Sequence, residues 1–175
     1  MSKEENDCQE IIKVILLGEC GAGKTCLINA YFGNKFKDNV ASTDSPESER
    51  KTMKINKKDY LIEIWDTAGQ EKYRSMNNLF IKGSKVVIFV YDATEEKSFS
   101  ELNYWVETTK EILGKSAIYG IAGNKADKVD NIEISEKEGE KYAKDNEAIF
   151  CSTSAKEDSK GFQKFLDNSL HNQIY

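Results

Sequence analysis

The most informative stretch of this chain is Gly18-Glu19-Cys20-Gly21-Ala22-Gly23-Lys24-Thr25. It fits the pattern G-x-x-x-x-G-K-[ST], in which backbone N–H groups of a glycine-rich loop surround phosphate oxygens, the lysine reaches the terminal phosphates and the threonine binds Mg²⁺. An apolar run over residues 11–17 predicts a buried strand before the loop, and apolar spacing over residues 25–32 predicts a helix after it. This context predicts a nucleotide-phosphate site and disfavours the alternative of a glycine-rich turn that binds nothing.

The composition fits one globular domain and argues against several other classes of protein. The chain has 175 residues, of which 39% are hydrophobic, and a net charge of −5 that argues against a nucleic-acid surface. No apolar run is long enough for a membrane span. Residues 1–10 are polar and lack the apolar core of a secretory signal, so we expect a flexible lead-in. None of the four cysteines forms a C-x-x-C pair, which predicts free thiols in a cytoplasmic protein.

The remaining hydrophobic patterns alternate between strands and helices. Further strands are predicted at residues 52–55 and 60–65, which form a hairpin around residues 56–59, and at 86–91, 117–122 and 148–151. Helices are predicted at residues 75–81, 99–113 and 162–170, with another opened by the capping box Ser135–Glu138. The polar stretch 34–50 is too long for an ordinary connection and predicts a functional loop. The pattern predicts an α/β fold with a six-stranded, mostly parallel sheet containing one antiparallel strand, flanked by about five helices.

The residues after the strand at 60–65 predict chemistry at the terminal phosphate. Asp66 comes directly after this strand, where an acid can hold Mg²⁺ opposite Thr25; the alternative is an ordinary helix cap. Gly69 offers a backbone N–H without a side chain, which suits contact with a γ-phosphate. Gln70 follows, and a glutamine there can orient an attacking water.

Two further motifs predict which base is bound. Asn124-Lys125-Ala126-Asp127 has the form N-K-x-D, and a carboxylate at Asp127 can accept both adjacent donors of guanine, N1–H and the exocyclic amine. Adenine lacks this pair of donors, so Asp127 favours guanine; the alternative is an ordinary polar turn. Ser154-Ala155-Lys156 follows the last strand, where its backbone could contact the guanine oxygen.

At this point the sequence resembles the Ras superfamily of small GTPases, and most closely its Rab family, over residues 11–170. Beyond the nucleotide motifs, the resemblance rests on Ile64-Trp65-Asp66-Thr67-Ala68-Gly69-Gln70-Glu71-Lys72-Tyr73-Arg74-Ser75, Phe80-Ile81-Lys82-Gly83-Ser84 and Val90-Tyr91-Asp92-Ala93-Thr94. It implies a single-domain P-loop GTPase fold over residues 11–171, followed by a short end at 172–175. It also implies Mg²⁺ as cofactor, GTP or GDP as bound nucleotide, slow GTP hydrolysis, and a switch role in vesicle trafficking.

The same resemblance implies a role for each matching residue. The nucleotide would contact Gly21, Ala22, Gly23, Lys24, Thr25, Cys26, Phe36, Thr43, Gly69, Asn124, Lys125, Asp127, Ser154, Ala155 and Lys156. Mg²⁺ would be held by Thr25, Thr43 and Asp66. Catalysis would involve Gln70, Lys24, Thr43 and Gly69. An exchange factor, a GTPase-activating protein and effectors would bind through residues 38–50 and 66–82.

The sequence departs from the Rab pattern in two places. After Thr43, the positions of a Rab glycine and a Rab aromatic residue hold Ser45 and Ser48, so the aromatic triad completed by Trp65 and Phe80 lacks one member. This leaves open a second hypothesis, a guanine-nucleotide-binding scaffold with impaired hydrolysis. The C-terminus shows no lipidation cysteines, so membrane attachment is expected only if a lipidated tail is missing from this chain. We otherwise expect a cytoplasmic location that can include the cytosolic face of endomembranes.

Overall fold

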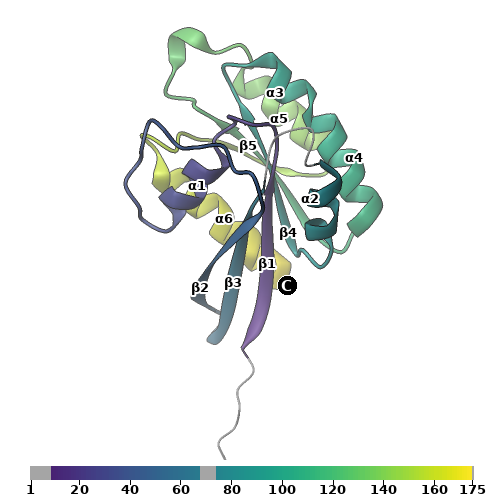
Figure 1. The fold of residues 1–175 in the computed structure, drawn as a ribbon. Coiled ribbons are helices and arrows are strands. Elements are labelled where there is room, and N and C mark those ends of the chain that lie inside the picture. Colours follow the sequence, from purple (N-terminus) through teal and green to yellow (C-terminus); the bar gives the residue numbers. More distant parts are fainter. Residues whose placement is uncertain (1–8, 68–73, 175) are drawn as a thin grey trace, which may run out of the picture.

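The computed structural model describes residues 9–67 and 74–174 as a six-stranded sheet with helices on both faces (Figure 1). The strands are β1 Glu10–Leu17, β2 Glu47–Ile55, β3 Lys58–Asp66, β4 Val86–Asp92, β5 Ile118–Asn124 and β6 Ile149–Ser152. Their order is β2-β3-β1-β4-β5-β6, and only β2 and β3 pair antiparallel. The predicted α/β fold with one antiparallel strand is therefore confirmed.

The helices form an outer layer on each face of the sheet. They are α1 Lys24–Tyr31, α2 Arg74–Ile81, α3 Glu96–Ser100, α4 Leu102–Leu113, α5 Glu136–Asp145 and α6 Ser159–Ile174, with a short 3₁₀ helix η2 Val129–Asn131. On one face, α1 and α6 contribute residues such as Leu27 and Phe162 to the core. On the other face, α2, α4 and α5 contribute residues such as Ile81, Trp105 and Ala143. Every residue of β4 is buried, as expected of a strand covered on both faces.

Three differences from the sequence prediction, apart from shifts of a few residues at element ends, have a physical explanation. β2 begins at Glu47, so the last part of the supposed loop 34–50 is strand; six consecutive exposed residues at this sheet edge hide the usual alternation. The hairpin turn is only Asn56-Lys57, both with positive φ (51° and 69°), as a tight two-residue hairpin turn requires. The single helix predicted at 99–113 is two helices in the structure: α3 ends before Glu101 and α4 begins after it.

The capping box predicted at the start of α5 is confirmed. The Ser135 hydroxyl accepts a hydrogen bond from the Glu138 backbone N–H at 3.3 Å, and the Glu138 carboxylate accepts one from the Ser135 N–H at 2.8 Å. The two side chains thereby satisfy two backbone donors that the helix itself leaves unpaired. Among the described helices, none combines the length and the apolar character that crossing a membrane requires.

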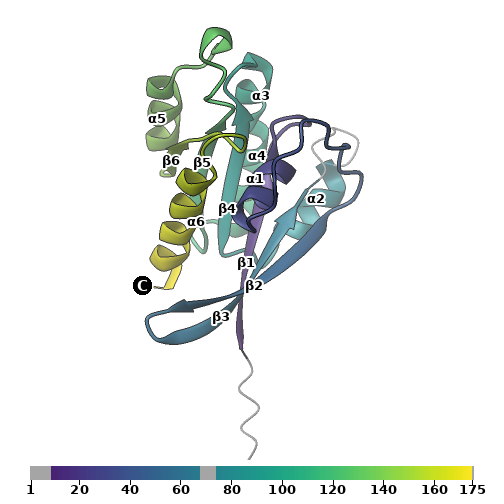
Figure 2. The same ribbon diagram turned by 90° about the vertical axis from the view of Figure 1, so that its left-hand side faces the viewer.

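The sheet topology brings the candidate motifs together at one edge. The five parallel strands end on the same side, and ligands in such folds bind outside the carboxyl ends of the strands. The phosphate loop follows β1, Asp66 ends β3, and Asn124 ends β5. In Figure 2, turned by 90° from Figure 1, the β2–β3 hairpin projects from the body of the sheet at the end where β1 begins. The site therefore forms from segments that are far apart in the sequence.

Candidate nucleotide-binding site

A cavity of about 320 Å³ lies at this edge of the sheet, and most of the predicted site residues line it. The predicted residues in its wall are Gly21, Gly23, Lys24, Thr25, Cys26, Phe36, Thr43, Asn124, Lys125, Asp127, Ala155 and Lys156. Ala22 and Ser154 are buried beside the wall. Gly69 and Gln70 lie outside the described residues. The segment 34–46 adds Asp38, Val40, Ala41 and Ser42 to the wall. The sequence predicted that this polar segment is a functional loop but did not identify these four residues as part of the site.

The phosphate loop needs glycine at two positions for steric reasons. Gly18 has φ 150°, and a Cβ there would lie 2.1 Å from the carbonyl oxygen of Val90 on β4. Gly23 has φ 95°, and a Cβ there would lie 2.2 Å from the side-chain amide nitrogen of Asn124. The loop can therefore pack against β4 and β5 only without side chains at these positions. Helix α1 starts directly after Gly23, so its partially positive N-terminus belongs to the cavity wall.

Lys24 is a buried cation at the centre of the phosphate loop. Its side-chain nitrogen donates to the carbonyl oxygens of Gly18 at 2.8 Å and Glu19 at 2.9 Å, and the residue is only 5% exposed. Burial lowers the pKa of Lys24 to about 8, against the opposing effect of nearby acidic groups that include Asp66. A phosphate anion in the cavity would compensate the charge that burial disfavours. The geometry therefore suits Lys24 to an anionic ligand.

Three side-chain oxygens meet where Mg²⁺ is expected. Thr25 Oγ1 donates to Asp66 Oδ2 at 2.5 Å, and Thr43 Oγ1 lies 3.2 Å from the same Asp66 oxygen and 3.1 Å from Thr25 Oγ1. The other oxygen, Asp66 Oδ1, is buried without a hydrogen-bond partner. Burial raises the pKa of Asp66, although the Thr25 hydrogen bond and the Lys24 charge act in the opposite direction.

This donor set fits a hard cation such as Mg²⁺, which prefers oxygen ligands and commonly takes only one or two from carboxylates. No cluster of three or more His, Cys, Asp or Glu side chains that could hold a metal occurs in the described ranges. The threonine hydroxyls and the Asp66 carboxylate would thus supply part of the shell. Phosphate oxygens and water would supply the rest.

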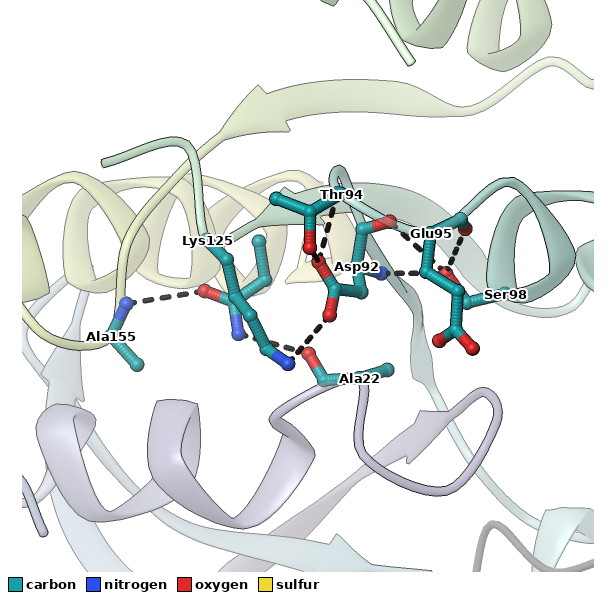
Figure 3. A network of polar contacts seen from close by, with 8 residues as sticks. Ala22, Asp92, Thr94, Glu95, Ser98, Lys125 and Ala155 are labelled. Carbon is teal, nitrogen blue, oxygen red and sulfur yellow. Dashed lines mark hydrogen bonds and ion pairs between the residues drawn. The ribbon is translucent and has the colours of Figure 1, made fainter. Parts of the chain in front are cut away.

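The base-recognition motif is held in place by hydrogen bonds to other loops. Asp127 Oδ1 accepts a hydrogen bond from the Ser154 hydroxyl at 2.6 Å, which joins N-K-x-D to the S-A-K segment. Lys125 has φ 63° and forms an ion pair with Asp92 Oδ2 at 2.5 Å (Figure 3). Burial would raise the pKa of Asp92, but hydrogen bonds from Lys125 and Thr94 outweigh it and lower the pKa. Asp92 is a site-supporting residue that the sequence analysis missed; its one signal was an acid ending a wholly apolar strand.

Asn124 joins the two halves of the site through protein contacts. Its side-chain nitrogen donates to the Ala22 carbonyl at 2.9 Å, and its side-chain oxygen accepts from the Ala155 N–H at 3.1 Å. In Figure 3, Ala155 lies to the left of the Lys125–Asp92 pair and Ala22 lies below it. Asn124 is only 1% exposed. Its described hydrogen bonds thus link the phosphate loop to the base-recognition segment.

We expect Asn124→Ala to destabilise the nucleotide-free protein by about 2–4 kcal/mol, because two buried partners lose their hydrogen bonds. Nucleotide affinity should fall as well, because the phosphate loop and the base-recognition segment are no longer fixed relative to one another. Urea unfolding of the nucleotide-free protein measures the first effect. The matched control is Asn103→Ala, because the exposed Asn103 side chain accepts a single described hydrogen bond, from partly buried Tyr142 on another helix. Equal stability changes in the two variants would contradict this role for Asn124.

The described cysteines are free thiols, as expected. Cys20 is exposed, Cys26 and Cys151 are partly buried, and Cys8 lies outside the described residues. Burial raises the pKa of Cys151 to about 11, so its thiol stays protonated near neutrality. Cys20 and Cys26 both line the cavity, and Cys20 Sγ lies 3.4 Å from the Ser42 hydroxyl. A ligand bound in the cavity should therefore protect the thiols of Cys20 and Cys26 from alkylation more than that of Cys151.

Comparison with known proteins gives a consistent picture. The family model described as "Ras family" matches residues 13–173. The human protein named Ras-related protein Rab-22A is 37% identical over 145 residues, which cover 83% of this chain and 75% of that protein. Human Ras-related protein Rab-8B is 34% identical over 156 residues, which cover 89% of this chain and 75% of that protein. Human Ras-related protein Rab-30 is 32% identical over 167 residues, covering 95% and 81%.

Proposed function

The chain belongs to the Ras family, with Rab proteins among its similar relatives, and from that premise we propose that it binds GTP or GDP with Mg²⁺ and slowly hydrolyses GTP. The observation that carries the proposal is the convergence of three groups on one cavity. Lys24 lies in the wall for phosphates, Thr25 and Thr43 for a metal, and Asp127 for a base. A site for phosphate alone would not require the third group.

In the proposed reaction the protein positions groups and stabilises charge. Bound Mg²⁺ would neutralise charge on the β- and γ-phosphates. Lys24 exchanges its two carbonyl acceptors for phosphate oxygens, so its charge lies where negative charge develops. Thr25, Thr43 and Asp66 would hold the metal in a partly buried pocket, where electrostatic interactions are stronger than in water.

Slow hydrolysis follows from the positions of the arginines. Arg50 and Arg74 are the only two in the sequence. Arg50 binds Glu63 at 2.6 Å, and Arg74 binds two carboxylates described below, so both guanidinium groups are engaged with the protein's own acids. In this class of enzymes an arginine supplied to the transition state contributes about 10³–10⁵ in rate. We therefore propose that a GTPase-activating partner supplies it.

Gln70 is the proposed water-orienting residue, although it lies outside the described residues. We expect Gln70→Leu to slow GTP hydrolysis by at least about tenfold and to leave GDP affinity unchanged, because leucine cannot accept a proton or orient water. Single-turnover hydrolysis of preloaded GTP measures the rate, and GDP titration supplies the control. An unchanged hydrolysis rate would remove Gln70 from the mechanism.

The proposed partner surface has an unusual chemistry for a Rab-like protein. The Trp65 and Phe80 rings pack at a tilted angle of 44° with centroids 5.0 Å apart, and Ser48 lies opposite Trp65 in the β2–β3 register. The Trp65 ring N–H donates to Glu63, whose other oxygen binds Arg50. We propose that exchange factors, activating proteins and effectors bind here, through residues 38–50 and 66–82, in vesicle trafficking on the cytosolic face of endomembranes.

Equilibrium binding tests the nucleotide proposal. With Mg²⁺ present, calorimetric titration should show GDP binding at least about 100-fold more tightly than ADP, because adenine cannot offer Asp127 two donors. Equal affinities would contradict guanine recognition. The alternative of a nucleotide-binding scaffold without hydrolysis is not favoured, because Thr43 contacts both Thr25 and Asp66 despite the altered residues after it.

A further inference from the structure

Arg74, the first residue of α2, connects the phosphate loop to the junction between α3 and α4. One of its terminal nitrogens donates to Glu19 Oε1 in the phosphate loop at 2.8 Å. The same nitrogen donates to Glu101 Oε2, between α3 and α4, at 2.6 Å. Two carboxylates thus share one guanidinium group, and all three side chains are at most 30% exposed. Such charge-assisted hydrogen bonds are stronger than neutral ones, particularly away from bulk water.

The guanidinium group is also held by aromatic rings of α4. Its central carbon lies 4.4 Å from the centroid of the Tyr104 ring and 5.6 Å from that of Trp105. Contacts of this kind position an arginine as well as stabilising its charge. Arg74 is therefore fixed against α4 independently of Glu19. A fixed arginine can hold the loop residue Glu19 in place.

Glu19 extends this connection to the phosphate-binding lysine. Its carboxylate binds Arg74, and its backbone carbonyl accepts the side-chain nitrogen of Lys24 at 2.9 Å. The neighbouring residue Cys20 lines the cavity. Arg74 thus restrains the segment of the loop on which Lys24 rests. A substitution of Arg74 should therefore weaken the retention of bound phosphates, although Arg74 does not line the cavity.

We propose that Arg74 is a positioning residue that slows nucleotide release by holding the phosphate loop through Glu19, with Glu101 and Tyr104 holding Arg74. This inference rests on the proposed guanine nucleotide binding. It assigns the α2–α4 contact a role in nucleotide retention. A partner that draws α2 away from Glu19 would accelerate release without touching the nucleotide.

The test compares Arg74→Met with Arg50→Met, which removes the other arginine and its Glu63 contact on β2 and β3. GDP dissociation, measured by displacement of a fluorescent GDP analogue, should be about tenfold faster in Arg74→Met, the effect of a typical coupling between sites. It should be unchanged in Arg50→Met. Arg74→Lys should restore part of the retention, because it keeps the charge but not the planar stacking group. Equal dissociation rates in Arg74→Met and Arg50→Met would overturn the proposal.

A double-mutant cycle tests whether the effect passes through Glu19. Glu19→Gln keeps the size of the side chain and should accelerate GDP release by a similar factor, and the double variant Glu19→Gln/Arg74→Met should add little more. Additive effects of the two substitutions would overturn the proposed route. Glu19→Gln also serves as the second variant if Arg74→Met folds poorly.

A second readout separates failure of this inference from failure of nucleotide binding. Alkylation of Cys20 in the nucleotide-free protein, followed by mass spectrometry of its peptide, reports on the loop without a nucleotide. The rate of Cys20 alkylation should be about fivefold higher in Arg74→Met than in Arg50→Met, because the loop loses a restraint. If the wild-type protein bound no GDP, the proposed function would fail and the Cys20 rates would decide the inference alone. Unchanged Cys20 rates would then overturn it.

Discussion

Asp127→Asn is expected to weaken GDP binding by at least about 100-fold. A carboxylate at residue 127 accepts hydrogen bonds from guanine N1–H and the exocyclic amine, and each hydrogen bond to a charged group contributes about 1.5–3 kcal/mol. Two such bonds correspond to roughly 100- to 10,000-fold in affinity. The asparagine amide can accept from N1–H, but its NH₂ group faces the exocyclic amine, which is also a donor.

The same substitution should change the preferred base, which excludes misfolding as the cause. Xanthine carries a carbonyl oxygen where guanine carries the amine, so the NH₂ group of asparagine would meet an acceptor. Asp127→Asn should therefore bind xanthosine diphosphate more tightly than GDP. Calorimetric titration with both nucleotides gives the result. Asp130→Asn, on exposed η2 outside the cavity wall, is the control with the same change of charge and should keep the GDP preference.

Lys24→Met is expected to remove function while changing stability little. Nucleotide affinity should fall by at least about 100-fold and GTP hydrolysis should be lost, because the buried cation placed for phosphate is removed. The free energy of unfolding of the nucleotide-free protein should change by less than about 2 kcal/mol. Lowering the Lys24 pKa from 10.5 to about 8 corresponds to roughly 3 kcal/mol of unfavourable burial, and the two lost hydrogen bonds to the Gly18 and Glu19 carbonyls offset a similar amount.

Urea unfolding without nucleotide and GDP titration measure the two sides of this prediction. The control is Lys137→Met on the exposed surface of α5, which should change neither quantity appreciably. A Lys24→Met protein that retains GDP affinity would contradict the role of Lys24 at the phosphates. A loss of several kcal/mol in the stability of the nucleotide-free protein would show that the carbonyl contacts outweigh burial of the charge.

The sequence predicted the parts of this site that are chemically local. The phosphate loop and N-K-x-D are short continuous motifs, and Asp66 is recognised by its place at the end of a strand. The order of the strands then brings all three to one edge of the sheet. The six strands followed from apolar runs and were confirmed. The first part of β2 was missed because an exposed edge strand carries no alternation. The division between α3 and α4 was missed because apolar spacing continues across Glu101.

The connections between motifs could not be predicted from the sequence. Arg74 contacts residues 55 positions before and 27 positions after it, and no short pattern reports such pairs. The resemblance assigned Asn124 to the nucleotide, whereas its described hydrogen bonds join Ala22 to Ala155. Asp92 supports Lys125 through an ion pair that depends on β4 and β5 being neighbours. These contacts arise from tertiary packing, which brings side chains together regardless of sequence distance.

Multiple-turnover phosphate release from GTP tests the central claim most directly. The protein should release phosphate slowly and continuously with Mg²⁺, and release should stop when EDTA removes the metal or Lys24→Met replaces the wild type. ATP should give no release above background. A protein that binds GDP but releases no phosphate from GTP, or releases it equally with EDTA, would contradict the proposed GTPase.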